Sequence, residues 1–203
     1  MAPAVMLTYS AYPAVADLSS LAVMEERYGS SDASGAVALD SDYMIVADDE
    51  ENLLRVYRRG GNTDSSVAAV KEWNFSDVTG LSKELDAEAL TRFDTDKILV
   101  VGSHSNKKDG GEAVSDRGHL VAVQVSGTGV DAEFTHLGTY SFLEQDLISW
   151  DQQNGDNYGF ADSASGGLAP ENVAGFSIEG ASVSHDGSTL WLGFRAPQAV
   201  RVV

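Results

Sequence analysis

The stretch DAEALTRFDTDKILVVGSHS, residues 86–105, decides the fold because it occurs again later in the chain. Residues 177–196 read SIEGASVSHDGSTLWLGFRA, and placing Glu88 over Glu179 aligns the two stretches without a gap. A weaker copy, DASGAVALDSDYMIVADDEE, occupies residues 32–51. In each copy an apolar run follows a polar turn. This pattern predicts two antiparallel strands joined by a tight turn.

The hairpins at residues 32–51 and 86–105 are each followed by further strand patterns, which extend them to units of four strands. Units of about 40–50 residues with four antiparallel strands are typical of β-propellers. The second strands of the units (ILVV, LWLG and MIVA) show no polar alternation, as expected for strands covered on both faces. The sequence therefore predicts an all-β fold, a β-propeller or partial propeller built of four-stranded antiparallel blades. A generic antiparallel sandwich is the alternative.

The blades divide the chain as follows. We expect an N-terminal segment of uncertain structure (1–27), one blade (28–75), a second blade (76–141), an insertion that begins with a helix (142–175) and a partial blade (176–203). A closed propeller has about four to eight blades. The sequence shows two blades and a partial third, which is fewer than a closed ring needs. Three explanations are open: the other segments supply further strands, the chain comes from a longer protein, or copies associate through their open blade edges.

Composition excludes several classes of partner. The chain of 203 residues carries a formal net charge of −18, which argues against nucleic acid and anionic membranes and favours a cation ligand. The same charge also favours solubility or a high-salt habitat. The chain has no cysteine, so disulfides and thiolate metal sites are excluded. No apolar run reaches the roughly 18–20 residues of a membrane span. The N-terminus lacks a basic region, so we expect no signal peptide and a soluble protein that is cytoplasmic by default.

Several stretches, in order, are similar to one known family. They are SDASGAVALD, VADDEENLLRVY, AEAL, VGSHSNKKDG and SIEGA followed by LWLGFRAP. Over about residues 28–196 the chain resembles the mainly bacterial β-propellers known as domain of unknown function 3616. The resemblance implies a propeller with distant similarity to calcium-dependent lactonases and esterase-like phytases, and it brings no established activity. In that family isoleucine and glycine flank the glutamate that Glu88 matches, whereas alanines flank it here, and the family continues beyond the last motif.

Hairpin geometry predicts where functional side chains gather. The start of a first strand lies beside the end of the second strand, and the first strand is innermost in a propeller. This end of each blade would therefore surround the mouth of the central channel. The side chains expected there are Asp48, Asp49, Glu88, His104, Glu179 and Arg195.

Converging carboxylates with few basic neighbours predict a Ca²⁺ or Mg²⁺ site. The expected metal ligands are Glu88, Glu179, Asp48 and Asp49, the expected acid/base is His104, and the expected anion contacts are Arg195, Lys107 and Lys108. A bound cation would polarise a carbonyl or phosphoryl oxygen and activate water, which predicts a hydrolase of small esters, lactones or phosphoesters. In the alternative, the glutamates pin neighbouring blades together, and the chain is a non-catalytic scaffold that binds a ligand or a protein.

Overall fold

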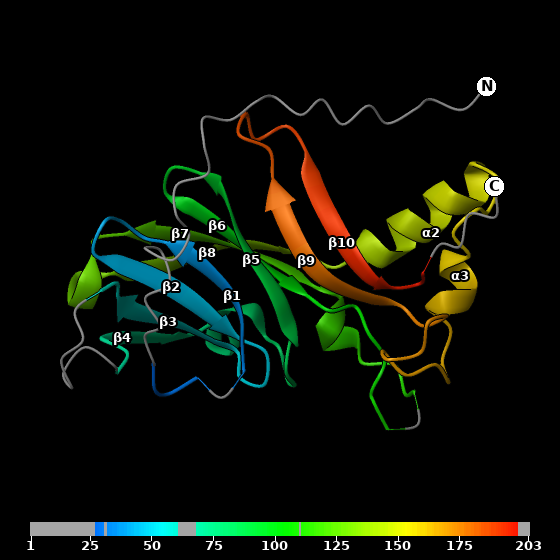
Figure 1. Cartoon of the computed structure of the whole chain (residues 1–203), viewed down its shortest axis with the longest axis horizontal. Helices are drawn as coiled ribbons and strands as arrows, with labels where there is room; N and C mark the ends of the chain where they lie inside the picture. The colour runs from blue at the N-terminus through cyan, green and yellow to red at the C-terminus, as the bar shows by residue number, and fades with distance from the viewer. Residues whose placement is uncertain (1–26, 31, 61–67, 110, 199–203) are drawn as a thin grey trace, which may run out of the picture.

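A computed structural model of the chain describes residues 27–30, 32–60, 68–109 and 111–198. Apart from Arg27, the predicted N-terminal segment lies outside the described residues. Within them the fold consists mainly of antiparallel strands (Figure 1). None of the described helices is long and apolar enough to cross a membrane.

The first sheet contains four strands, each antiparallel to the next in chain order. The strands are β1 (Ala33–Ala38), β2 (Tyr43–Asp48), β3 (Leu53–Arg58) and β4 (Lys71–Asn74). Asp40 forms the turn between β1 and β2, because its carboxylate accepts the backbone N–H groups of Asp42 and Tyr43. The prediction of a four-stranded antiparallel unit is confirmed here.

The second sheet repeats this arrangement, again in chain order. Its strands are β5 (Ala87–Asp94), β6 (Lys97–Gly102), β7 (Leu120–Ser126) and β8 (Glu133–Tyr140). The short helix α1 (Ser76–Thr79) connects the two sheets, and the 3₁₀ turns η3 (Ser115–Gly118) and η4 (Gly129–Asp131) precede β7 and β8.

A two-stranded hairpin completes the described fold. It consists of β9 (Ser177–Val183) and β10 (Leu190–Ala196), and it follows the helices α2 (Leu143–Gln153) and α3 (Phe160–Ser163). The expected helix at the start of the insertion is therefore confirmed as α2. Asp151 holds the turn between the two helices, because its buried carboxylate accepts the backbone N–H groups of Tyr158 and Phe160.

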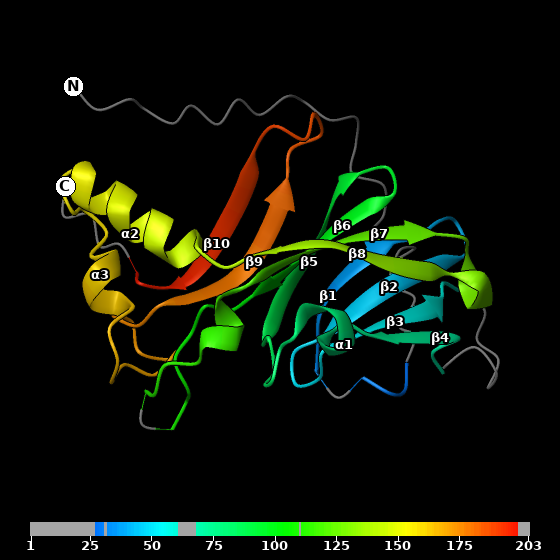
Figure 2. The same ribbon diagram turned by 180° about the vertical axis from the view of Figure 1, so that it is seen from behind.

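The first strands of the three sheets lie next to one another, with β5 between β1 and β9 (Figures 1 and 2). Gly35 allows the close approach of β1, since a Cβ at this position would lie 2.5 Å from the backbone nitrogen of Leu90. On the other side, the N–H of Val183 donates a hydrogen bond of 3.2 Å to the hydroxyl of Thr91. The start of each first strand is thereby brought to a common region.

Two hydrophobic cores join the sheets. The first core lies between the first and second sheets and includes Ile45, Leu54 and Val121. The second core lies between the second sheet, the β9–β10 hairpin and the two helices, and it includes Val101 and Phe176. The strand β6 contributes side chains to both cores. This confirms that β6, the second strand of its unit, is covered on both faces.

The same expectation is wrong for β10. Alternate residues of β10 are exposed, and Trp191 retains 66% of its accessible surface. The physical reason is that the described residues place no further sheet against the outer face of this hairpin. Those residues form antiparallel sheets and no closed ring of blades.

Candidate metal centre

Three carboxyl groups from the first and second sheets lie close together. Asp49 follows β2 directly, Asp86 precedes β5, and Glu88 lies within β5. One ligand oxygen from each residue lies within 4.8 Å of the others, and all three residues are half-buried. The structure thus brings Asp49 and Glu88 together, as the hairpin geometry predicts, and it adds Asp86. We call these three residues the acidic cluster.

The backbone at the start of β5 explains how two of these carboxylates meet. The register between β5 and β6 shifts between Ala87 and Ala89, so that Glu88 lies in a bulge. A bulge redirects a side chain from regular alternation. Asp86 has a φ of 56°, in the left-handed region that aspartate adopts more readily than most residues. The bulge and the left-handed residue therefore bring Asp86 and Glu88 to the same site.

The environment of Glu88 favours its neutral form. Burial, together with the charges of neighbouring acidic groups, raises the pKa of Glu88 to about 7. Among these groups Glu179 has the largest effect, followed by Asp86 and Asp49, while Arg195 opposes them. A cation at this position would replace the repulsion with attraction.

Asp49 shows the same imbalance. Burial, followed by the charge of Asp32, raises the pKa of Asp49 to about 6. The Oδ1 atom of Asp49 is buried, and no described protein group donates a hydrogen bond to it. A buried acceptor without a donor is costly, which makes this oxygen available for a cation.

Asp86 is fixed in place by Arg117, a basic residue of the η3 turn. Nη1 of Arg117 lies 3.0 Å from the Asp86 carboxylate, and the Ser105 hydroxyl donates a hydrogen bond of 3.2 Å to it. Arg117 also pairs with Glu84 at 2.5 Å. In the described part of the chain, Arg117 pairs with Asp86, whereas no ion pair involves Asp49 or Glu88.

Glu179 lies at the border of the acidic cluster. It comes from β9, and its carboxylate accepts hydrogen bonds from Arg195 of β10 at 3.2 Å and from Ser177 at 3.0 Å. The Glu179–Arg195 ion pair is partly exposed. The structure therefore pairs Glu179 within its own hairpin and not with a neighbouring blade, and its role as a metal ligand stays a prediction.

Asp48 points into the first sheet and not into the cluster. Its side chain is 1% exposed and pairs with Arg55 at 2.9 Å, while Ser30 donates a further hydrogen bond at 2.6 Å. Arg55 itself is buried and also pairs with Glu51 and Glu72. Because Asp48 is the last residue of β2, its side chain alternates to the face opposite that of Asp49. The expectation that both aspartates ligate one ion is not supported by this arrangement.

The two lysines expected at an anion site are paired with other groups. Lys107 pairs with Glu112 at 2.7 Å, and Lys108 pairs with Glu171 at 3.1 Å. Both lysine side chains are exposed. Lys107 is paired within the loop after β6, whereas the partner of Lys108 comes from the segment between α3 and β9.

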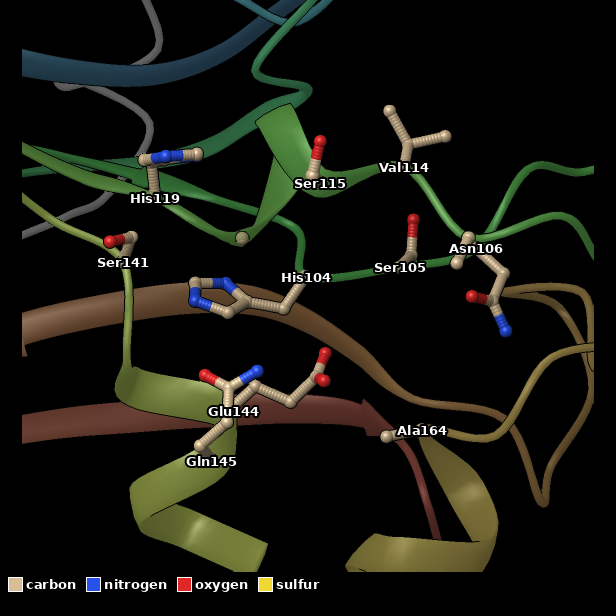
Figure 3. A pocket seen from close by; sticks show the side chains of 12 residues that line it. His104, Ser105, Asn106, Val114, Ser115, His119, Ser141, Glu144, Gln145 and Ala164 are labelled. Carbon is tan, nitrogen blue, oxygen red and sulfur yellow. The ribbon is translucent and has the colours of Figure 1, made fainter.

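His104 lies in a different pocket from the acidic cluster. Its imidazole projects between the start of β7 and helix α2, near Ser141 and Gln145 (Figure 3). None of the residues that line this pocket belongs to the acidic cluster. The expected meeting of His104 with the glutamates therefore does not occur, since the chain turns at His104 with a φ of 56°.

The acidic cluster has the chemistry of a calcium site. Two oxygens on opposite sides of a Ca²⁺ ion, each at about 2.4 Å, are separated by about 4.8 Å. The separations of the cluster oxygens lie within this limit. Calcium takes six to eight oxygen ligands, so three carboxylates leave positions for water or for an oxygen of a bound molecule.

Asp86 was not among the ligands expected from the sequence, although its position two residues before Glu88 was a usable signal.

Comparisons with known proteins assign no family to the chain. No family model matches it, and no curated protein is significantly similar to it.

Proposed function

We propose that this chain binds a divalent cation, Ca²⁺ before Mg²⁺, at Asp49, Asp86 and Glu88. The observation that carries the proposal is the approach of three half-buried carboxylates from two sheets to within 4.8 Å. The raised pKa values of Asp49 and Glu88 support it, because they report negative charge that the protein itself does not neutralise. A cation held here would also link the first sheet to the second.

We further propose that the sheets are blades of a β-propeller of the kind that the sequence resembles. The adjacency of β1, β5 and β9 supports this architecture, because first strands line the axis of a propeller. The face-to-face packing of the first two sheets supports it as well. On this proposal the cation lies at one end of the innermost strands.

The bound cation would present open coordination positions to a carbonyl, carboxylate or phosphoryl oxygen. If it also activates water, the protein hydrolyses small esters, lactones or phosphoesters. The positions of His104, Lys107 and Lys108 instead favour the second candidate, a non-catalytic propeller that binds an oxygen-rich ligand or a protein. None of these three residues lines the acidic cluster, so the proton carrier and anion contacts of the hydrolase would have to be other groups.

Thermal unfolding tests the cation site. The protein is melted in EDTA and then in excess CaCl₂ or MgCl₂, and the same is done for Asp49→Asn/Glu88→Gln. Calcium at one hundred times its Kd would stabilise the native protein by about 2.7 kcal/mol. For a chain of this size that is a rise in Tm of about 5–10 °C. We expect the rise in the native sequence and its loss in the double variant.

The matched control is Asp131→Asn/Glu133→Gln, which removes the same charge from two exposed residues at the start of β8. This control should keep the full calcium response. An equal calcium response in both double variants, or none in the native sequence, contradicts the proposal. Once calcium binding is measured, ester, lactone and phosphoester substrates with and without EDTA separate the hydrolase from the scaffold.

A further inference from the structure

A second candidate site lies on the far side of the loop that follows β6. It is a pocket of about 450 Å³ between this loop, the start of β7 and the first turn of α2 (Figure 3). This volume is in the range of sites for small organic ligands. The polar residues that line it include His104, His119, Ser115, Ser141, Glu144 and Gln145.

His104 is the unusual member of this lining. It is 4% exposed, and its Nδ1 lies 2.9 Å from the carbonyl oxygen of Gly102. A carbonyl only accepts, so Nδ1 carries the proton and Nε2 presents a lone pair. No described protein group donates to this buried Nε2. Burial lowers the pKa of His104, which keeps the ring neutral and Nε2 an acceptor at neutral pH.

The backbone holds this acceptor in place at a cost. His104 has a φ of 56°, a left-handed conformation that residues other than glycine adopt at an energetic cost. The fold therefore maintains both a strained residue and an unsatisfied buried nitrogen. Both features are explained if Nε2 accepts a hydrogen bond from a molecule in the pocket.

The other ionisable groups of the lining are acceptors too. Nδ1 of His119 lies 2.9 Å from the carbonyl oxygen of Asp116, so its Nε2 also presents a lone pair. Glu144 adds a carboxyl group whose pKa is raised by burial. The residues that line the pocket include no lysine or arginine. The two imidazole acceptors therefore favour a ligand that supplies hydrogen-bond donors, and the absence of a cationic side chain from the lining disfavours an anion.

The spacing of these acceptors decides between an ion and a larger molecule. In the ranges that the structure describes, the acidic cluster is the group of three ligating residues whose atoms lie within 4.8 Å of one another. His104, His119 and Glu144 do not form such a group, so one metal ion cannot contact all three. Donors on separate atoms of one molecule can.

We propose that this pocket binds a small neutral molecule with several hydroxyl groups, one of which donates a hydrogen bond to Nε2 of His104. Further hydroxyls donate to Nε2 of His119 and to the Glu144 carboxyl. None of the three ligands of the cation site lines this pocket, although Ser105 of the lining donates a hydrogen bond to Asp86.

Imidazole ¹⁵N NMR tests this proposal, because the chain has four histidines and two of them serve as internal controls. The protein is titrated with myo-inositol and with D-glucose at constant calcium. We expect saturable shifts of the Nε2 resonances of His104 and His119, with His136 and His185 unchanged. Ethanolamine and inorganic phosphate are the comparison ligands, and they should give no saturable shift at His104.

A variant links the shifts to the pocket. His119→Phe removes one acceptor at a half-exposed position, and it should weaken binding about three- to tenfold while the His104 resonance still responds. His136→Phe, in β8, should leave the affinity unchanged. The proposal is overturned if no histidine responds to either polyol, if all four respond alike, if only ethanolamine or phosphate shifts His104, or if His119→Phe binds as tightly as the native sequence.

Discussion

The Glu88→Gln substitution should stabilise the metal-free protein at pH 8 and have little effect near pH 4. In the folded protein the pKa of Glu88 is raised from 4.5 to about 7. A raised pKa means that folding favours the protonated carboxyl. Its contribution to stability is fully present below about pH 4.5 and is lost as the pH rises through 7. Glutamine keeps the shape of the side chain without the charge.

The magnitude follows from the size of this shift. One pKa unit corresponds to about 1.4 kcal/mol, so the whole shift gives an upper value of about 3.4 kcal/mol. Glu88 is only half-buried, and solvent and salt screen part of the repulsion. We therefore expect a gain of about 1–2 kcal/mol at pH 8 in EDTA, or a rise in Tm of about 2–8 °C for a chain of this size.

Urea denaturation in EDTA at pH 4.5, 6 and 8 measures this effect for the native sequence and for Glu88→Gln. The exposed Glu133→Gln is the control, and it should change the free energy of unfolding by less than about 0.5 kcal/mol at every pH. In excess calcium the order should reverse at pH 8, because the native protein gains a ligand that the variant lacks. If Glu88→Gln is less stable than the native protein at pH 8 in EDTA, Glu88 has a structural role and the repulsion argument is refuted.

Two further predictions concern the architecture, and urea denaturation measures both. Arg55→Met should lower the free energy of unfolding by about 3 kcal/mol, because it leaves the buried Asp48 carboxylate without its cation. The double variant Arg55→Met/Asp48→Asn should recover part of this loss. If Arg55→Met alone costs less than about 1 kcal/mol, the ion pair is not needed for stability. Gly35→Ala should cost about 1–3 kcal/mol, since the new Cβ would meet the backbone of β5. Gly138→Ala in β8 has open space and is the control, and an equal effect of both glycine substitutions would contradict the close approach of β1 to β5.

Much of the fold follows from local patterns in the sequence. The strands of both four-stranded sheets and the helix α2 are recognisable because alternation, apolar runs and turn residues act over a few neighbouring positions. The meeting of Asp49 with Glu88 follows only from the expected propeller arrangement, in which the first strands of neighbouring blades lie side by side, because pairing within a hairpin joins strands of one sheet. Asp86 could have been included on the same grounds.

The direction and partner of each side chain depended on the tertiary structure. Asp48 and Asp49 are neighbours in the sequence, yet Asp48 is committed to Arg55 while Asp49 joins Asp86 and Glu88. His104 was expected at the glutamates, but its left-handed backbone turns the ring to a pocket that is completed by α2.

The sequence by itself determined the antiparallel sheets, the end at which acidic residues gather and the exclusion of thiolate chemistry. Only the tertiary structure decided which carboxylates form one cluster and which pocket receives His104. The physical reason is range. Strand pairing and turns are set by residues close in the chain, whereas burial, ion pairing and unsatisfied hydrogen-bonding groups depend on how separate sheets and helices pack against one another.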